Sequence, residues 1–216
     1  MWSPDGRAVI YASNRSDGRF DLYRKTVGGL GERDLLLESD VNQYPMSWSP
    51  DGKLLAVQQG PDIWVLPLED DRDAYPFVQT GAIELWGVFS PDGRWMAFES
   101  HESGQEEVYV TPFPGPGRKW QVSKDGGQRP WWRRDGREIV YQEPGGWVFA
   151  VKVEGAEDSF VVGDPTPLFQ APPRSTLSPY YAPMPDFERF LVLKMTEAQD
   201  PGPLTLVVNW TAELER

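Results

Sequence analysis

One pentapeptide returns along the chain at a nearly constant spacing, and this repetition limits the possible folds more than any other feature. Trp-Ser-Pro-Asp-Gly occupies positions 2–6 and 48–52, Phe-Ser-Pro-Asp-Gly positions 89–93, and Trp-Arg-Arg-Asp-Gly positions 132–136. The aspartates of these copies lie 46, 41 and 43 residues apart, and a degenerate copy, Met-Pro-Asp-Phe-Glu, places Asp186 a further 51 residues on. A period in the low forties is typical of a β-propeller blade of four strands.

The residues that follow each aspartate alternate as residues of a buried strand do. The fourth and sixth positions beyond the aspartate are apolar or aromatic in all five copies. They are Val9, Leu55, Met96, Ile139 and Phe190 at the fourth position, and Tyr11, Val57, Phe98, Tyr141 and Val192 at the sixth. Side chains two positions apart share one face of a strand. Because intervening residues such as Ala56 and Ala97 are also apolar, we expect a strand that is buried on both faces.

The pentapeptide has the composition of a tight turn. Proline presets φ near −65°, aspartate bonds to nearby backbone, and glycine accepts the positive φ that returns the chain. We therefore interpret each copy as the hairpin between the innermost strand of a blade and the next strand, with the aromatic residue wedged between neighbouring blades. The residues of these predicted turns are Trp2, Asp5, Gly6, Trp48, Asp51, Gly52, Phe89, Asp92, Gly93, Trp132, Asp135 and Gly136.

The sequence thus predicts an all-β chain, a single β-propeller domain over residues 1–216 made of four-stranded antiparallel blades. The blades are expected at approximately 1–41, 42–82, 83–125, 126–178 and, incomplete, 179–216. Third strands are expected at 21–27, 62–68, 107–113, 147–153 and 204–210, and fourth strands around Leu35–Leu37 and Tyr75–Val78. Since the pattern opens on an inner strand and ends on a third strand, we expect about five blades of a six- or seven-bladed ring.

Composition excludes several classes of function. The formal net charge of −12 disfavours direct binding to nucleic acid, because such a surface repels phosphate backbones. No run of about 18 apolar residues occurs, so we expect no insertion of this chain into a membrane, and the first residues do not resemble a targeting signal. Cysteine is absent, which excludes disulfides and thiol chemistry.

Two long stretches carry a resemblance to a known family. They are Phe-Ser-Pro-Asp-Gly-Arg-Trp-Met-Ala-Phe-Glu-Ser-His-Glu-Ser-Gly-Gln-Glu-Glu-Val-Tyr-Val within 89–123 and Asp-Gly-Gly-Gln-Arg-Pro-Trp-Trp-Arg-Arg-Asp-Gly-Arg-Glu-Ile-Val-Tyr at 125–141. Together with the closing Leu-Thr-Leu-Val-Val-Asn-Trp, they resemble the TolB-like propeller repeats found C-terminal to bacterial eukaryotic-type serine/threonine kinases. His101 stands where that pattern more often has asparagine, and Phe187 replaces the turn glycine of the last copy, so a weaker hairpin is expected there.

The resemblance implies a non-catalytic binding or sensor propeller, the C-terminal part of a bacterial signalling protein. It implies an extracytoplasmic, periplasmic location and a membrane-anchored parent that carries a cytoplasmic kinase. The kinase motifs themselves are absent from this chain, so no kinase activity is expected of it. Two alternatives stay open: the gating propeller of a prolyl-oligopeptidase-like serine peptidase, and a TolB-type envelope scaffold. A catalytic domain after residue 216 would favour the first, and a small mixed domain upstream the second.

The sequence offers little support for chemistry within the chain. His101, the sole histidine, lies in a polar segment without a Gly-x-Ser-x-Gly elbow, so we expect no catalytic triad. One histidine without cysteine leaves only carboxylates for zinc, and the acidic run 69–73 lacks the spacing of a calcium loop. We therefore expect no catalytic residues, no cofactor and no metal.

What remains is a surface for a partner, either a protein or a small ligand. Propellers bind partners where loops of successive blades converge. The loops that precede the inner strands are expected at 42–44, 83–85 and 128–130, and a flanking loop at 101–105. The candidate residues of this partner face are Tyr44, Glu84, Gln128, Arg129 and His101.

Overall fold

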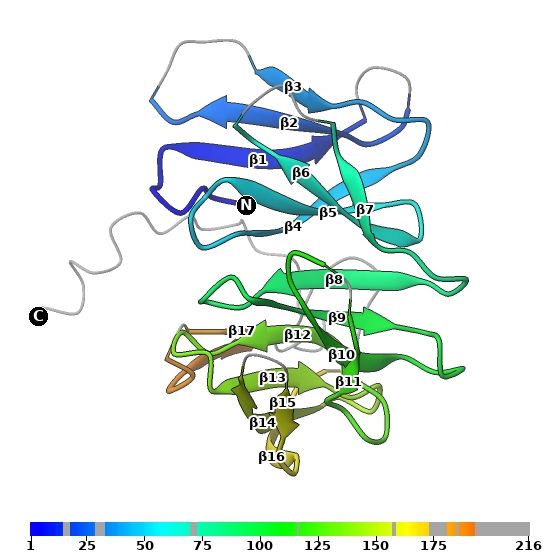
Figure 1. Ribbon diagram of the computed structural model, residues 1–216. Helices are drawn as coiled ribbons and strands as arrows, with labels where there is room; N and C mark the ends of the chain where they lie inside the picture. Colours follow the sequence, from blue (N-terminus) through cyan, green and yellow to red (C-terminus); the bar gives the residue numbers. More distant parts are fainter. Residues whose placement is uncertain are drawn as a thin grey trace, which may run out of the picture.

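The computed structural model of the chain describes residues 1–14, 18–28, 33–69, 73–115, 117–156, 159–172, 181–184 and 186–192. Every regular element in these residues is a β-strand, and the first four sheets follow one another in sequence order along the molecule (Figure 1). The predicted all-β class and the antiparallel blades are confirmed. Over the same residues, no helix is long and apolar enough to cross a membrane.

Four sheets correspond to the first four predicted blades. The first contains β1 (Ala8–Ser13), β2 (Asp21–Thr26) and β3 (Asp34–Leu37). The second contains β4 (Gln43–Trp48), β5 (Leu54–Gln59), β6 (Asp62–Pro67) and β7 (Tyr75–Val78). The third contains β8 (Glu84–Phe89), β9 (Trp95–Ser100), β10 (Glu107–Pro112) and β11 (Trp120–Gln121). The fourth contains β12 (Gln128–Trp132), β13 (Glu138–Gln142), β14 (Trp147–Gly155), β15 (Phe160–Val162) and β16 (Thr166–Gln170).

The strand order follows the order along the chain, as the repeat predicts. β4, β5, β6 and β7 are hydrogen-bonded neighbours in that order, and β8 to β11 repeat the arrangement. In the fourth sheet the long strand β14 pairs with both β15 and β16. The chain then forms the short pair β17 (Tyr181–Pro183) and β18 (Phe190–Val192). The third strand expected at 204–210 lies outside the described residues.

Burial of the strand that follows the motif is greatest in the third and fourth blades. In the second blade β6 buries more residues than β5, and in the first β2 buries more than β1. All six residues of β9 are buried. One apolar cluster joins the third and fourth sheets, a second joins the second and third, and another joins the first and second. The core is therefore a series of layers between sheets, as expected for blades that pack face to face.

The repeated pentapeptide forms the turn between the first and second strands, and the third copy shows its bonding. The Ser90 hydroxyl donates to Asp92 Oδ1 at 2.6 Å, and the Arg94 backbone N–H donates to the same oxygen at 3.1 Å. Gly93 N–H donates to the Ser90 carbonyl at 2.9 Å, with φ of 71° at the glycine. The first two copies make the same set of bonds. The motif is thus satisfied by its own local structure.

The two divergent copies keep the turn with other residues. In the fourth, Arg133 takes the place of serine, and its Nε and Nη2 donate to the two oxygens of Asp135 at 2.8 and 2.7 Å. In the degenerate copy, Phe187 adopts φ of 60° and its N–H donates to the Met184 carbonyl at 2.9 Å. A phenylalanine in the left-handed region is strained, which gives a physical basis for the weaker hairpin expected there.

The aromatic residue of the motif packs between blades in three of the four copies. Trp132 joins the core between the third and fourth sheets, and its indole N–H donates to the Val88 carbonyl at 3.1 Å. Phe89 packs edge-on against Phe113, and Trp48 lies at the cluster between the first two sheets. Trp2 differs from the expectation, because it is 62% exposed.

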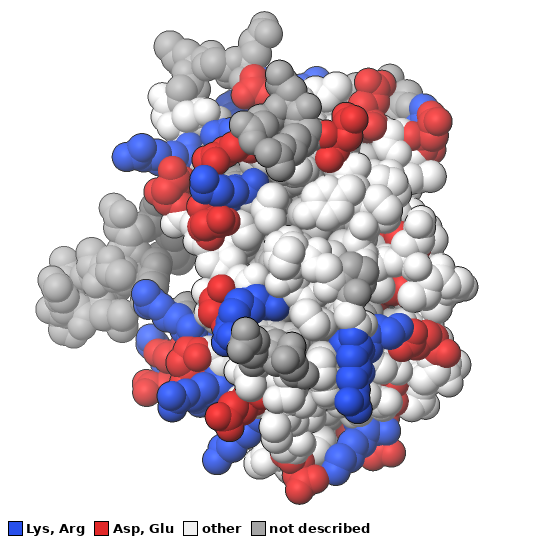
Figure 2. Space-filling view, in the orientation of Figure 1, with Lys and Arg blue, Asp and Glu red and all other residues white. Residues whose placement is uncertain are grey.

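The blade stack has two edges that differ in character. The repeated turns that precede β5, β9 and β13 lie along one edge, at the left of Figure 1, and we call this edge the turn face. The chain enters β4, β8 and β12 and passes from β9 to β10 at the opposite edge, which we call the loop face. Figure 2 shows basic and acidic residues interspersed along the turn-face side and fewer charges near the loop-face side of this view.

Candidate functional site on the loop face

The predicted partner residues are less exposed than a contact surface requires. Glu84 and Gln128 are the first residues of β8 and β12, and they are 0% and 4% exposed. Arg129 is 5% exposed, Tyr44 in β4 is 37% exposed, and the His101 side chain is 32% exposed. The structure therefore leaves Tyr44 and part of His101 on the surface of the loop face, and places the other three beneath it.

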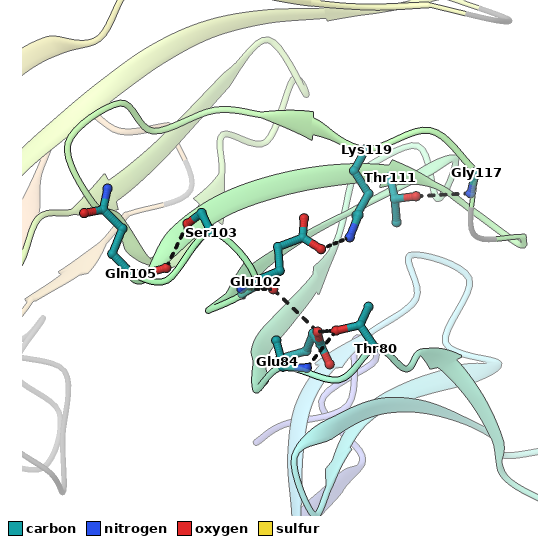
Figure 3. A network of polar contacts seen from close by, with 10 residues as sticks. Thr80, Glu84, Glu102, Ser103, Gln105, Thr111, Gly117 and Lys119 are labelled. Carbon is teal, nitrogen blue, oxygen red and sulfur yellow. Dashed lines mark hydrogen bonds and ion pairs between the residues drawn. The ribbon is translucent and has the colours of Figure 1, made fainter.

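Glu84 is buried within a small polar network. The Thr80 hydroxyl donates to Glu84 Oε1, and the Ser100 hydroxyl lies 3.5 Å from the same oxygen (Figure 3). Burial raises the pKa of Glu84, and the hydrogen bond from Thr80 opposes this rise. The carboxyl therefore anchors the loop that precedes β8 from the inside.

Arg129 is held by contacts to three residues on different elements. Its guanidinium lies over the Trp86 ring at 4.3 Å, its backbone N–H donates to Glu99 Oε2 at 3.3 Å, and its carbonyl accepts from the Tyr181 hydroxyl at 3.4 Å. The φ angles of Trp86 and Arg129 are 55° and 52°, and strand pairing shifts register at both places. Such strained bulges re-aim side chains near functional sites.

His101, a candidate residue of the partner face, lies between two carboxylates. Its Nε2 is 3.5 Å from Glu99 Oε1 and 3.7 Å from Glu106 Oε1. The amide of Gln128 donates to Glu106. The structure thus brings His101, Gln128 and Arg129 together through Glu99 and Glu106.

Tyr44, the remaining candidate of the partner face, is not part of this cluster. It lies apart and packs against Phe20, with ring centroids 5.4 Å apart.

The sequence analysis did not identify Glu99 as a residue of this site. The seventh position beyond the motif aspartate is nevertheless polar in three copies, as Gln58, Glu99 and Gln142. A repeated polar residue in an otherwise apolar strand was the available signal. Positions 70–72 of the acidic run lie outside the described residues.

A shallow hollow of about 700 Å³ opens beside this group on the loop face. Its lining is formed by Pro61, residues 80–83, His101, Glu102 and Gly104. Glu102 forms an ion pair with Lys119, which ties the β9–β10 loop to the outer part of the third sheet (Figure 3). The side chains of Val41, Tyr44 and Ile83, all at the entrances to inner strands, are 42%, 37% and 46% exposed. The loop face therefore combines a hollow with exposed apolar side chains.

Comparisons with known proteins point to one group of relatives. No family model matches the chain. Two curated proteins named Tol-Pal system protein TolB, from Anaeromyxobacter dehalogenans (strain 2CP-1) and Anaeromyxobacter sp. (strain K), are each 33% identical to it over 114 residues. The alignment covers 51% of this chain and 26% of each relative, so the chain spans about a quarter of the relatives' length.

Solved structures agree in fold. A putative TolB from Agrobacterium tumefaciens superposes with a TM-score of 0.64 and 21% identity, over 79% of this chain and 64% of that one. TolB from Acinetobacter baumannii gives a TM-score of 0.59 and 22% identity, over 79% of this chain and 42% of that one. The β-propeller domain of Cps50 from Myceliophteria thermophila gives 0.54 at 9% identity, over 76% and 56%. At these identities the structures support the propeller fold alone.

Proposed function

We propose that this chain, a TolB-like β-propeller domain, is a non-catalytic binding module that takes a polypeptide segment on its loop face. The proposal rests on one observation above the others, the hollow of about 700 Å³ on that face, whose lining includes the exposed side chain of Ile83. The opposite edge is occupied by turns whose polar groups are satisfied locally. A hollow of about 740 Å³ also opens on the turn face, but charged side chains form most of its lining. The loop face therefore offers the less charged surface for a partner.

The chemistry of the loop face favours a polypeptide. Tyr44 is exposed and amphipathic, and tyrosine is among the residues enriched at protein interfaces, while Val41 and Ile83 add exposed apolar area on the same face. The ion pair of Glu102 and Lys119 supplies a polar margin beside the hollow. The net charge of −12 makes an acidic or nucleic-acid partner unfavourable and a basic or neutral segment favourable.

Two settings for such a module follow from the two lines of resemblance, and in both the module works outside the cytoplasm. The curated matches favour a TolB-type envelope scaffold. The stretches at 89–123 and 125–141 favour a sensor propeller attached to a kinase. The sequence upstream in the parent gene decides between them: a small mixed domain supports the scaffold, and a kinase domain followed by about 20 apolar residues supports the sensor.

Photo-crosslinking in cells of the source bacterium tests the binding face directly. A photoreactive phenylalanine analogue replaces Ile83 in the parent protein, and in a matched control it replaces Val161 on β15, which is 60% exposed. Adducts to a polypeptide at position 83 and none at position 161 are expected. Equal adducts at both positions, or none at 83, would show that the loop face does not bind a polypeptide.

A further inference from the structure

We propose that Glu99, His101 and Glu106 form a binding site for a divalent transition-metal ion of the Zn²⁺ class. Glu99 lies on β9, His101 begins the loop that follows, and Glu106 ends that loop beside β10. One nitrogen and two carboxylate oxygens of these residues all lie within 4.8 Å of one another. This site departs from the sequence-based expectation of no metal, because the expectation did not include the meeting of these three residues in space.

The distances suit a small ion held between the three atoms. Zn²⁺ lies about 2.0–2.2 Å from nitrogen and oxygen ligands, so tetrahedral ligands are separated by about 3.4 Å. His101 Nε2 is 3.5 Å from Glu99 Oε1 and 3.7 Å from Glu106 Oε1. Glu106 has a side chain that is 25% exposed, so it has room for the small rotation that brings its oxygen to the ion.

A second observation points to a ligand at the same place. The Gln128 residue is 4% exposed, its Nε2 donates to Glu106, and its Oε1 is buried with no hydrogen-bond partner among the described residues. His101 Nε2 is likewise buried without a hydrogen-bond partner within the described part of the chain. A buried polar atom without a partner is costly. A bound ion satisfies the imidazole nitrogen directly, and a water on the ion satisfies Gln128 Oε1.

Neighbouring groups already orient the two carboxylates. The Arg129 backbone N–H donates to Glu99 Oε2 at 3.3 Å, which directs Oε1 towards His101. Gln128 holds Glu106 Oε2 in the same way and leaves Oε1 facing the imidazole. Hydrogen bonds of this kind to the ligands are a regular feature of metal sites. Because Gln128 and Arg129 belong to β12, a bound ion connects the third and fourth sheets.

The set of ligands determines the class of ion. An imidazole with two carboxylates suits Zn²⁺ and similar transition metals, whereas Ca²⁺ and Mg²⁺ take oxygen ligands throughout. His101 also lines the hollow on the loop face. An ion at this site therefore fixes one wall of that hollow.

The unique histidine allows a direct test. The ¹⁵N-labelled chain, prepared without a polyhistidine tag, is titrated with Zn²⁺ while the two ring nitrogens of His101 are followed by NMR and the affinity is measured by calorimetry. We expect one ion per chain and a shift of the Nε2 resonance. Excess Ca²⁺ or Mg²⁺ is not expected to displace Zn²⁺.

Variants separate this site from adventitious binding. His101→Ala is expected to weaken Zn²⁺ binding at least 100-fold, and Gln128→Met about 10- to 100-fold. Glu102→Gln removes a carboxylate from the same loop without touching the three ligands, and it is expected to leave the affinity unchanged. Circular dichroism confirms that each variant is folded. Absence of binding to the folded chain, an unchanged affinity in His101→Ala, or equal loss in Glu102→Gln would overturn the proposal.

Discussion

Truncation of the motif tryptophan to alanine should destabilise the protein strongly in one copy of the repeat and hardly at all in another. Trp132 is 9% exposed, packs against the Phe160 ring with centroids 6.1 Å apart, and donates its indole N–H to the Val88 carbonyl. Trp2 occupies the same place in its pentapeptide but is 62% exposed. Trp132→Ala therefore removes a ring from between two sheets, whereas Trp2→Ala removes a ring from the surface.

The magnitude follows from the burial of each ring. Loss of a buried aromatic side chain costs about 3–5 kcal/mol of the free energy of unfolding, because it removes transfer free energy and leaves a cavity. In a domain of this size each kcal/mol shifts Tm by about 2–4 °C, so Trp132→Ala is expected to lower Tm by about 6–20 °C. A surface substitution changes stability by about 0.5 kcal/mol or less, which sets the expectation for Trp2→Ala.

Urea unfolding of the wild-type chain and the two variants, followed by circular dichroism, gives the comparison. Trp132→Phe is a milder variant that keeps a ring but loses the indole donor, and its loss is expected to lie between those of the two alanine variants. Similar losses for Trp2→Ala and Trp132→Ala would refute the conclusion that the motif aromatic stabilises the protein by packing between blades.

Three further predictions concern the turns and the buried carboxyl. Gly52→Ala should lower the free energy of unfolding by about 1–2 kcal/mol, because φ is +75° at Gly52, while Gly81→Ala, at ordinary φ in open space, should have little effect in the same urea assay. Asp135 has a pKa lowered from 3.8 to about 2, chiefly by the hydrogen bond from Arg133. Its ionised form therefore stabilises the fold above about pH 4, this contribution is lost as the pH falls towards 2, and Asp135→Asn should flatten the acid limb of a stability–pH curve. Burial raises the pKa of Glu84, so its ionised form destabilises the fold at high pH. Glu84→Gln should raise the stability measured at pH 8, and this gain should shrink as the pH falls; a constant gain would contradict the assignment.

The sequence predicts the strands well because each blade repeats one local pattern. Turn chemistry in the pentapeptide and a period of two after it locate β5, β9 and β13 without any knowledge of tertiary contacts. The exposure of the Trp2 side chain was not predicted from the sequence. Exposure depends on whether another sheet covers the ring, and the pentapeptide is the same in either case. Local chemistry thus determines the elements, and packing between sheets determines which aromatic residues are buried.

The loop face was predicted only in outline. The expectation located the loops that enter β8 and β12, but Glu84 and Arg129 lie beneath the surface rather than on it. Glu84 is bonded to Thr80 and Ser100. Arg129 has a positive φ and a backbone hydrogen bond to Glu99, which lies 30 positions earlier in the chain. Such contacts depend on how neighbouring sheets approach each other, and a strand pattern carries no information on that approach.

Hydrogen exchange followed by mass spectrometry tests the central claim, that the repeat builds blades that stack face to face and bury strands between them. Amides in fully buried strands exchange through the largest openings and those of edge strands through small ones. Amides of β9, in which all six residues are buried, should be among the slowest, and those of β3, with two exposed residues, among the fastest. Exchange of β9 as rapid as that of β3 would contradict the stacked-blade structure.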